Sequence, residues 1–193
     1  MALEKTIYII GGCNGAGKTT ASFTILPEII DCKEFVNADE IAKGLSPFQP
    51  DAASFEAGRI MLQRIEEMVR QNKTFAFETT LASIIYKKRL EAAQKAGYSI
   101  FLIYFWLQNA DLAKERVKVR VMEGGHNIIP EIIERRYYRG ISNLFNVYLP
   151  LVNSAMILDN SNGVPELLAE KMYTGELSVI NTALFQQLEN LSK

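Results

Sequence analysis

The sequence contains the octapeptide Gly12-Cys13-Asn14-Gly15-Ala16-Gly17-Lys18-Thr19, which fits the pattern G-x-x-x-x-G-K-[ST] of a phosphate-binding loop. The apolar run Thr6–Ile10 precedes it and predicts a buried strand. The stretch Lys18–Ile30 follows it and predicts a helix that is interrupted or ends near Pro27, because proline lacks an amide hydrogen. Strand, glycine loop and helix therefore occur in the order that phosphate binding requires. This order disfavours the alternative of a glycine-rich turn with an incidental lysine.

The residue types in this loop suit a nucleotide and a hard cation. Glycines let main-chain amides converge on phosphate oxygens, and the helix N-terminus adds partial positive charge. Lys18 is expected to reach the β- and γ-phosphates, and the Thr19 hydroxyl to bind Mg²⁺. Cys13 is either a sensitised thiol or a small residue that fills the loop. The expected nucleotide contacts are Gly12, Asn14, Gly15, Ala16, Gly17, Lys18, Thr19 and Thr20, together with Arg116 from the later lid insert.

Length and composition exclude several classes of protein. The 193 residues predict a single domain, 1–193, with a core of its own. The 21 basic and 22 acidic residues give a net charge of −1, so we expect neither nucleic acid nor a membrane surface as a partner. The longest apolar run, Ile100–Leu107, is far shorter than the roughly 20 residues of a membrane-spanning helix. With one His, two Cys and no secretory signal, we expect a cytoplasmic protein without a His/Cys zinc site.

Strands and helices alternate along the chain, which predicts an α/β fold. We expect a P-loop NTPase with a five-stranded parallel sheet flanked by helices, and a helical lid insert at about 110–148 interrupted by Gly124-Gly125-His126-Asn127. A small hairpin around Thr174-Gly175 and a final helix would complete the chain. The predicted strands are Thr6–Ile10, Phe35-Val36, Thr74–Phe77, Tyr98–Leu107 and Ala155–Leu158, and the predicted helices are Lys18–Ile30, Ser54–Gln71, Ser83–Lys95, Ala110–Glu123 and Pro130–Tyr148.

The remaining motifs favour a small kinase over other nucleotide-binding proteins. No Asp begins a D-x-x-G, and Asn72-Lys73-Thr74-Phe75 lacks the Asp of a guanine-reading N-K-x-D, so a Ras-like GTPase is disfavoured. The chain is also too short for the signature loops of large motor or transporter ATPases. Phosphoryl transfer to a hydroxyl needs a carboxylate beside the acceptor, a metal ion and cations that cover the developing charge.

Carboxylates follow three of the predicted strands. Asp39 and Glu78 should face the nucleotide, because the carboxyl ends of parallel strands line the same crevice as the phosphate loop. Asp39 is a candidate general base, or else the N-cap of a helix that begins at Glu40. Glu78, with Thr79 and Thr80, is a candidate acceptor-binding group, or else a solvated loop carboxylate. Asp159 also ends a strand, which leaves the carboxylate that supports the metal ambiguous.

The lid insert is locally basic, unlike the whole chain. Arg116 and Arg120 are four residues apart, so they share a helix face and can point at a phosphate. Arg136 flanks the apolar stripe of the second lid helix and is the better candidate for an inward role. The alternative for this group is a solvated basic face, which is favoured for Lys118, Arg135 and Arg139, and the role of His126 stays open.

Five stretches together resemble the zeta-toxin family of P-loop kinases, in its chromosomal branch of small stand-alone ATPase-like proteins. They are GGCNGAGKTT (11–20), FVNADEIAKGLSP (35–47), FAFETTLAS (75–83), RVKVRVMEGGHNIIPEIIERRYYRGISNL (116–144) and LDNSNG (158–163). The resemblance implies a fold similar to nucleoside-monophosphate and shikimate kinases. It also implies transfer of the ATP γ-phosphate to the 3′-hydroxyl of UDP-N-acetylglucosamine, impaired peptidoglycan synthesis, and a possible antitoxin partner.

Carried over by motif, the resemblance gives roles to six residues. Lys18 and Thr19 match the phosphate and Mg²⁺ contacts, Asp39 the base, Glu78 the substrate-side carboxylate, and Arg120 with Arg136 the lid arginines. Two other functions stay open: a kinase for another hydroxyl compound, such as a nucleotide, nucleoside or antibiotic, and an ATP-binding switch protein without an acceptor.

Overall fold

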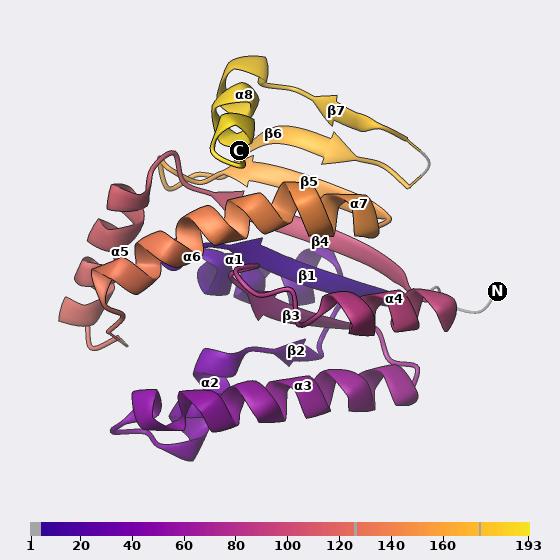
Figure 1. Cartoon of the computed structure of the whole chain (residues 1–193). Coiled ribbons are helices and arrows are strands. Elements are labelled where there is room, and N and C mark those ends of the chain that lie inside the picture. Colours follow the sequence, from indigo (N-terminus) through magenta and orange to yellow (C-terminus); the bar gives the residue numbers. More distant parts are fainter. Residues whose placement is uncertain (1–4, 126, 174) are drawn as a thin grey trace.

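The computed structural model describes residues 5–125, 127–173 and 175–193. In these residues one seven-stranded sheet has the order β2-β3-β1-β4-β5-β6-β7. Figure 1 shows this sheet running through the whole molecule. The strands are β1 (Thr6–Gly12), β2 (Phe35–Val36), β3 (Phe75–Thr79), β4 (Ser99–Trp106), β5 (Ser154–Asp159), β6 (Glu166–Lys171) and β7 (Leu177–Val179).

The five strands predicted from the sequence are present, and all of them run parallel. Strand β1 lies between β3 and β4, so that Ile9 is paired with both Phe77 and Leu102. These three side chains are fully buried, as expected of strands covered on both faces. The parallel register also brings the carboxyl ends of β1 and β3 side by side, which places the phosphate loop next to Glu78.

The sheet has seven strands in the described residues, two more than predicted. Strands β6 and β7 form the expected C-terminal hairpin, but they also extend the main sheet in antiparallel fashion beyond β5. The connection 160–165 between β5 and β6 is too short for the crossover that a parallel strand would need. Thr174, in the predicted turn of the hairpin, lies outside the described residues.

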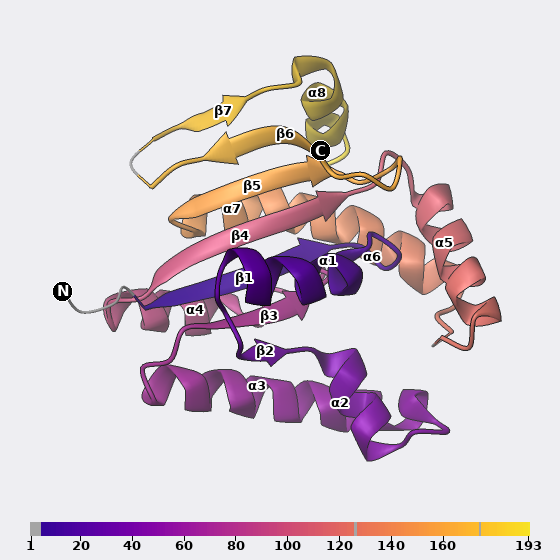
Figure 2. The ribbon, with the colours of Figure 1, turned by 180° about the vertical axis from the view of Figure 1, so that it is seen from behind.

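Helices cover both faces of the sheet and the edge formed by β2. Figure 1 shows α4, α6 and α7 in front of the sheet, and Figure 2 shows α1 on the opposite face. Helices α2 and α3 lie beside the edge strand β2, and α8 lies beside β6, next to the other edge strand β7. The helices are α1 (Lys18–Thr24), η1 (Ile25–Ile29), α2 (Ala38–Leu45), η2 (Pro50–Ala53), α3 (Ser54–Arg70), α4 (Lys87–Lys95), α5 (Ala110–Met122), α6 (Pro130–Asn143), η3 (Leu144–Tyr148), α7 (Leu149–Leu151) and α8 (Thr182–Asn190).

Two predicted helices differ locally from the structure. The stretch predicted as Lys18–Ile30 changes from α1 to the π-helix η1 at Ile25, and Pro27 lies inside η1. The helix predicted from Ser83 begins only at Lys87, since the Ser83 hydroxyl accepts a hydrogen bond from Ile85 N at 3.3 Å and favours a turn there. No helix in the described part of the chain combines the length and apolar character needed to span a membrane.

The predicted lid insert is formed by α5, α6 and η3. Helix α5 projects at the carboxyl end of the parallel strands, whereas α6 lies along one face of the sheet (Figures 1 and 2). Gly140 lets α6 approach the chain after β3, because a Cβ there would lie only 2.5 Å from the Thr80 carbonyl oxygen. The second lid helix is thus packed directly against the segment that follows Glu78.

The sheet interior should dominate the stability of the fold. Leu102→Ala, in fully buried β4, should lower the free energy of unfolding by about 2–5 kcal/mol, because it removes buried methyl groups and leaves a cavity. Leu45→Ala is the matched control, since Leu45 is 45% exposed, and it should cost much less. Urea denaturation measures both values, and equal losses would contradict this account of the core.

Candidate functional site

The phosphate loop connects β1 to α1, as predicted. The expected nucleotide contacts from Gly12 to Thr20 lie at the end of β1, in this loop or in the first turn of α1, whereas the expected contact Arg116 lies in α5. Gly17 has φ +81°, a left-handed conformation that glycine adopts without a steric penalty. Ala16, in the same loop, is fully buried. The loop therefore has the conformation and position that anion binding at a helix N-terminus requires.

Lys18 is buried, although its side chain carries an ammonium group. Only 6% of it is exposed, and its Nζ donates a hydrogen bond to the Cys13 carbonyl oxygen at 2.9 Å. The same Nζ lies 3.4 Å from Glu78 Oε1. A buried charge is costly without such partners, so these contacts hold the ammonium group in a fixed position between the loop and Glu78.

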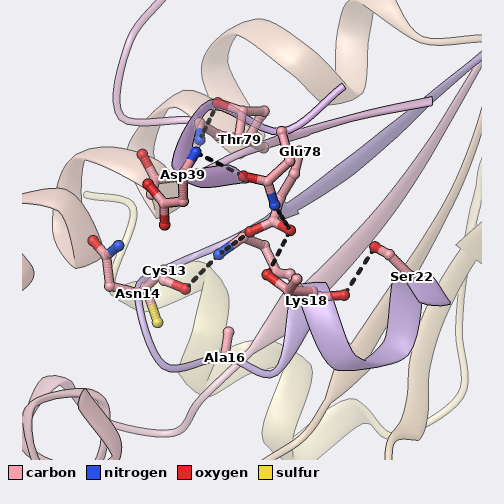
Figure 3. A network of polar contacts seen from close by, with 12 residues as sticks. Cys13, Asn14, Ala16, Lys18, Ser22, Asp39, Glu78 and Thr79 are labelled. Atoms are coloured by element: carbon pink, nitrogen blue, oxygen red, sulfur yellow. Dashed lines mark hydrogen bonds and ion pairs between the residues drawn. The ribbon is translucent and has the colours of Figure 1, made fainter. Parts of the chain in front are cut away.

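Glu78 links the end of β3 to the phosphate loop. Its Oε2 accepts hydrogen bonds from Thr19 Oγ1 at 2.8 Å and from Asn37 Nδ2 at 2.9 Å. Figure 3 shows the carboxylate directed at Lys18 rather than at solvent. The alternative of a solvated loop carboxylate is therefore wrong, because the side chain is only 11% exposed and fully engaged.

Asn37 is a site residue that was not predicted from the sequence. Its Oδ1 caps α2 by accepting from Asp39 N at 2.8 Å and Glu40 N at 3.4 Å, while its Nδ2 donates to Glu78. The alternative in which Asp39 caps a helix beginning at Glu40 is wrong, because α2 begins at Ala38. An Asn directly after a strand and before a helical stretch is a common N-cap signal. The cap leaves the Asp39 carboxylate near the loop (Figure 3).

A cavity of about 360 Å³ opens above the phosphate loop. It gathers the predicted acceptor-binding groups and, except for Arg120, the predicted catalytic groups, which come from the loop, β3, α2 and α6. The lining residues are Asn14, Lys18, Asn37, Ala38, Asp39, Met61, Glu78, Thr79, Thr80, Ala82, Ser83, Tyr86, Arg135, Arg136 and Arg139. The arrangement places two carboxylates, an ammonium group and three guanidinium groups around one space.

Arg136 points inward, as predicted from the apolar stripe of α6. Its Nη1 donates to Asn14 Oδ1 at 3.3 Å. Burial lowers the pKa of Arg136, an effect that Asp39 opposes and the nearby Arg135 reinforces. Arg135 and Arg139 are exposed, as predicted, but they also line the cavity. This second role was not predicted because the outward face of α6 borders the cavity, which a helical wheel does not reveal.

The arginines of α5 occupy other positions. Arg120 lies in a neighbouring cavity of about 310 Å³, whose lining also includes Thr19, Asp39 and Lys43. It therefore approaches the loop from a different side than Arg136 does. Arg116 Nη2 donates to the Ser161 carbonyl oxygen at 2.7 Å, so in this structure Arg116 ties α5 to the turn after β5. His126 lies outside the described residues.

Asp159 does not join Asp39 and Glu78 in the cavity. Its side chain is 4% exposed, and its Oδ2 accepts from Gln108 Nε2 at 2.7 Å. Its Oδ1 accepts from both the main-chain N–H and the hydroxyl of Ser161. In the structure Asp159 thus holds the turn after β5 and lies outside the cavity that Asp39 and Glu78 line. No group of three or more His, Cys, Asp or Glu residues that could hold a metal occurs in the described part of the chain.

Cys13 is a buried filler of the loop. Burial raises the pKa of its thiol to about 11, and the nearby Lys18 only partly opposes this effect. A thiol with such a pKa is protonated at neutral pH and is a poor nucleophile. The alternative of a sensitised thiol is therefore wrong.

Comparison of the sequence with known protein families identifies the family of this chain. The model of the family described as zeta toxin matches residues 2–162, which is most of the chain. The chain therefore belongs to the zeta toxin family. A protein of Haemophilus influenzae, described as uncharacterized, is 31% identical over 136 residues, which are 69% of this chain and 93% of that protein.

Solved structures confirm the fold class. A chain of the crystal structure of AvrRxo1-ORF1:-ORF2 with ATP has a TM-score of 0.75 and 16% identity, and the match covers 100% of this chain and 65% of that one. The present chain thus spans about two thirds of that relative. A chain of the PezAT chromosomal toxin–antitoxin system of Streptococcus pneumoniae has a TM-score of 0.65 and 15% identity, covering 99% and 86%. The fold is therefore the α/β fold of P-loop kinases.

The buried thiol of Cys13 predicts a pH-dependent contribution to stability. Because folding raises its pKa from about 9 to about 11, the thiol stabilises the folded state below pH 9, and this contribution is lost as the pH rises through 11. Relative to Cys13→Ala, the wild-type free energy of unfolding should fall by on the order of 2 kcal/mol between about pH 8 and about pH 10.5. Denaturation curves of both proteins test this, and a pH-independent difference would contradict it.

Proposed function

We propose that the protein is a kinase that transfers the γ-phosphate of ATP to a hydroxyl group of a small-molecule acceptor. The observation that carries the proposal is that Lys18 and Asp39, from different elements, line one cavity directly above the phosphate loop. Two further findings support it: membership of the zeta toxin family, and the presence of ATP in the AvrRxo1-ORF1:-ORF2 crystal structure. A protein that only holds a nucleotide does not need a carboxylate at this position.

Different residues around the cavity have different roles in the proposed phosphoryl transfer. The loop amides and Lys18 bind and orient the triphosphate. Asp39 takes the proton of the acceptor hydroxyl, whose oxygen then forms a bond to the γ-phosphorus while the bond to the leaving ADP oxygen breaks. Arg120 and Arg136 approach from two sides and balance the charge that develops on the transferred group.

The donor atoms near Thr19 fit Mg²⁺. Thr19 Oγ1 and Glu78 Oε2 lie 2.8 Å apart, and both are hard oxygen donors of the kind this ion prefers. Thr19 would bind the ion directly and Glu78 would hold it or its water. When bound, Mg²⁺ supplies positive charge to the β- and γ-phosphates. Glu78 is thus assigned to the loop side of the cavity, and Thr79 and Thr80 remain for the acceptor.

We propose UDP-N-acetylglucosamine, or a similar sugar nucleotide, as the acceptor. The family resemblance suggests this class, and an antitoxin is a corresponding candidate partner, since one structural relative belongs to a toxin–antitoxin system. The wall formed by Arg135, Arg136 and Arg139 supports an anionic acceptor. The polar side chains of Thr79, Thr80 and Ser83 supply groups that can hydrogen-bond a sugar.

The acceptor is tested by incubating the purified protein with Mg²⁺, γ-labelled ATP and UDP-N-acetylglucosamine. We expect a labelled sugar nucleotide, and none with Lys18→Ala, because the buried ammonium that orients the triphosphate is lost. Label on a nucleoside, nucleotide or antibiotic in a parallel panel, but not on the sugar nucleotide, would reject this acceptor and keep the kinase. ATP binding without transfer to any acceptor would instead indicate a switch protein.

The role of Asp39 predicts a separation of turnover from binding. Asp39→Asn should lower kcat by about 10²- to 10⁴-fold, because the amide cannot accept the acceptor proton. The Kd for ATP should change little, since Asp39 lies outside the phosphate loop. Asp31→Asn is the matched control at an aspartate whose side chain is 83% exposed, and it should be as active as wild type. An unchanged kcat in Asp39→Asn would remove Asp39 from the base role.

A further inference from the structure

Asn160, in the turn after β5, makes a long-range contact with the phosphate loop. Its side chain is 7% exposed, and its Nδ2 donates to the Ala16 carbonyl oxygen at 2.8 Å, although the two residues are 144 positions apart in the sequence. Its main-chain N–H donates to the Trp106 carbonyl oxygen at 2.9 Å, which continues the pairing between β4 and β5. Asn160 is therefore anchored on the sheet while its amide reaches the loop.

The turn that carries Asn160 is held by its neighbours. The carboxylate of Asp159 accepts from Ser161 and Gln108, and the Ser161 hydroxyl accepts from Gln108 N at 2.9 Å. Arg116 binds the Ser161 carbonyl oxygen from α5. These contacts hold the turn in place, so the Asn160 amide is a fixed donor to the loop.

Fixing the Ala16 carbonyl group also fixes the next N–H group. The peptide between Ala16 and Gly17 is planar and trans, so its C=O and N–H point in opposite directions. Because the Ala16 carbonyl oxygen points at Asn160 Nδ2, the Gly17 N–H points away from Asn160. The contact is close, since a Cβ at Gly17 would lie 2.6 Å from Asn160 Nδ2.

Packing alone does not explain an asparagine at this position. Asn160 Oδ1 is buried and has no hydrogen-bond partner among the described residues. An unpaired buried acceptor destabilises the folded state, and an apolar side chain of similar size would avoid this cost. The hydrogen bond that Nδ2 donates to the loop therefore explains why an amide side chain occupies this position.

We propose that Asn160 is a positioning residue that aims the Gly17 N–H at the phosphates of the bound nucleotide. This inference rests on the proposed function only in that the loop must bind a triphosphate. It predicts that loss of the Asn160 donor weakens nucleotide binding even when the protein remains folded. Asn160 touches neither the reacting atoms nor the cavity that contains Asp39.

The test compares binding of a fluorescent, non-hydrolysable ATP analogue with Mg²⁺ to four proteins. Asn160→Asp keeps the shape of the side chain but sets a carboxylate against the Ala16 carbonyl oxygen, and Asn160→Ala removes the whole carboxamide without adding a charge. Asn162→Asp is the matched control, because Asn162 is exposed two positions away. We expect the Kd to rise about tenfold or more in Asn160→Asp, less in Asn160→Ala, and not in Asn162→Asp.

Protonation gives a second readout that a purely structural role would not move. A neutral carboxyl group at position 160 can again donate to the Ala16 carbonyl oxygen. The ratio of the Kd of Asn160→Asp to that of wild type should therefore fall as the pH is lowered. Thermal unfolding, followed in parallel, identifies the temperature range in which every variant is folded.

The outcomes separate this inference from the proposed function. Weaker binding by folded Asn160→Asp and Asn160→Ala supports it, and wild-type affinity in both, whatever their melting temperatures, overturns it. If Asn160→Asp does not fold, Asn160→Ala decides in the same way. If wild type itself does not bind the analogue, the proposed kinase function fails and this inference fails with it. Binding by wild type without transfer to any acceptor leaves the inference supported and only the kinase function rejected.

Discussion

The arrangement of the site depends on the need of one buried ammonium group for partners. Lys18 belongs to the phosphate loop, and without compensation its charge would destabilise the interior. Glu78 supplies the opposite charge from the end of β3, and is itself held by Thr19 and Asn37. This network joins the ends of β1 and β3 to the start of α2. Loop, carboxylate and helix are thus held together by contacts between the protein's own side chains.

The position of Asp39 depends on the same network. Because Asn37 caps α2 with one side-chain atom and binds Glu78 with another, Asp39 is presented in the first turn of a helix whose start is fixed. The two carboxylates are then placed differently: Glu78 is buried against the loop, and Asp39 is more open to the cavity. Different surroundings give similar groups different properties, which is the basis of the roles proposed for Glu78 in binding charge and for Asp39 in accepting a proton.

The sequence predicted those features that depend on local pattern. The phosphate loop, the five parallel strands and the inward Arg136 follow from a motif, apolar runs and helical spacing. The roles of Asp159 and Asn160 did not follow, because their partners are Gln108 and Ala16, 51 and 144 residues away. The positions of Arg135 and Arg139 were missed for a related reason, since periodicity identifies a buried face but not a cavity beside the exposed one.

The most direct measurement is a crystal structure of the protein with a non-hydrolysable ATP analogue, Mg²⁺ and UDP-N-acetylglucosamine. We expect the triphosphate on the loop amides with Lys18 at its β- and γ-phosphates, and an acceptor hydroxyl of the sugar within hydrogen-bonding distance of Asp39. A triphosphate bound away from the loop, or an acceptor hydroxyl far from Asp39 while the nucleotide is in place, would contradict the proposed division of roles.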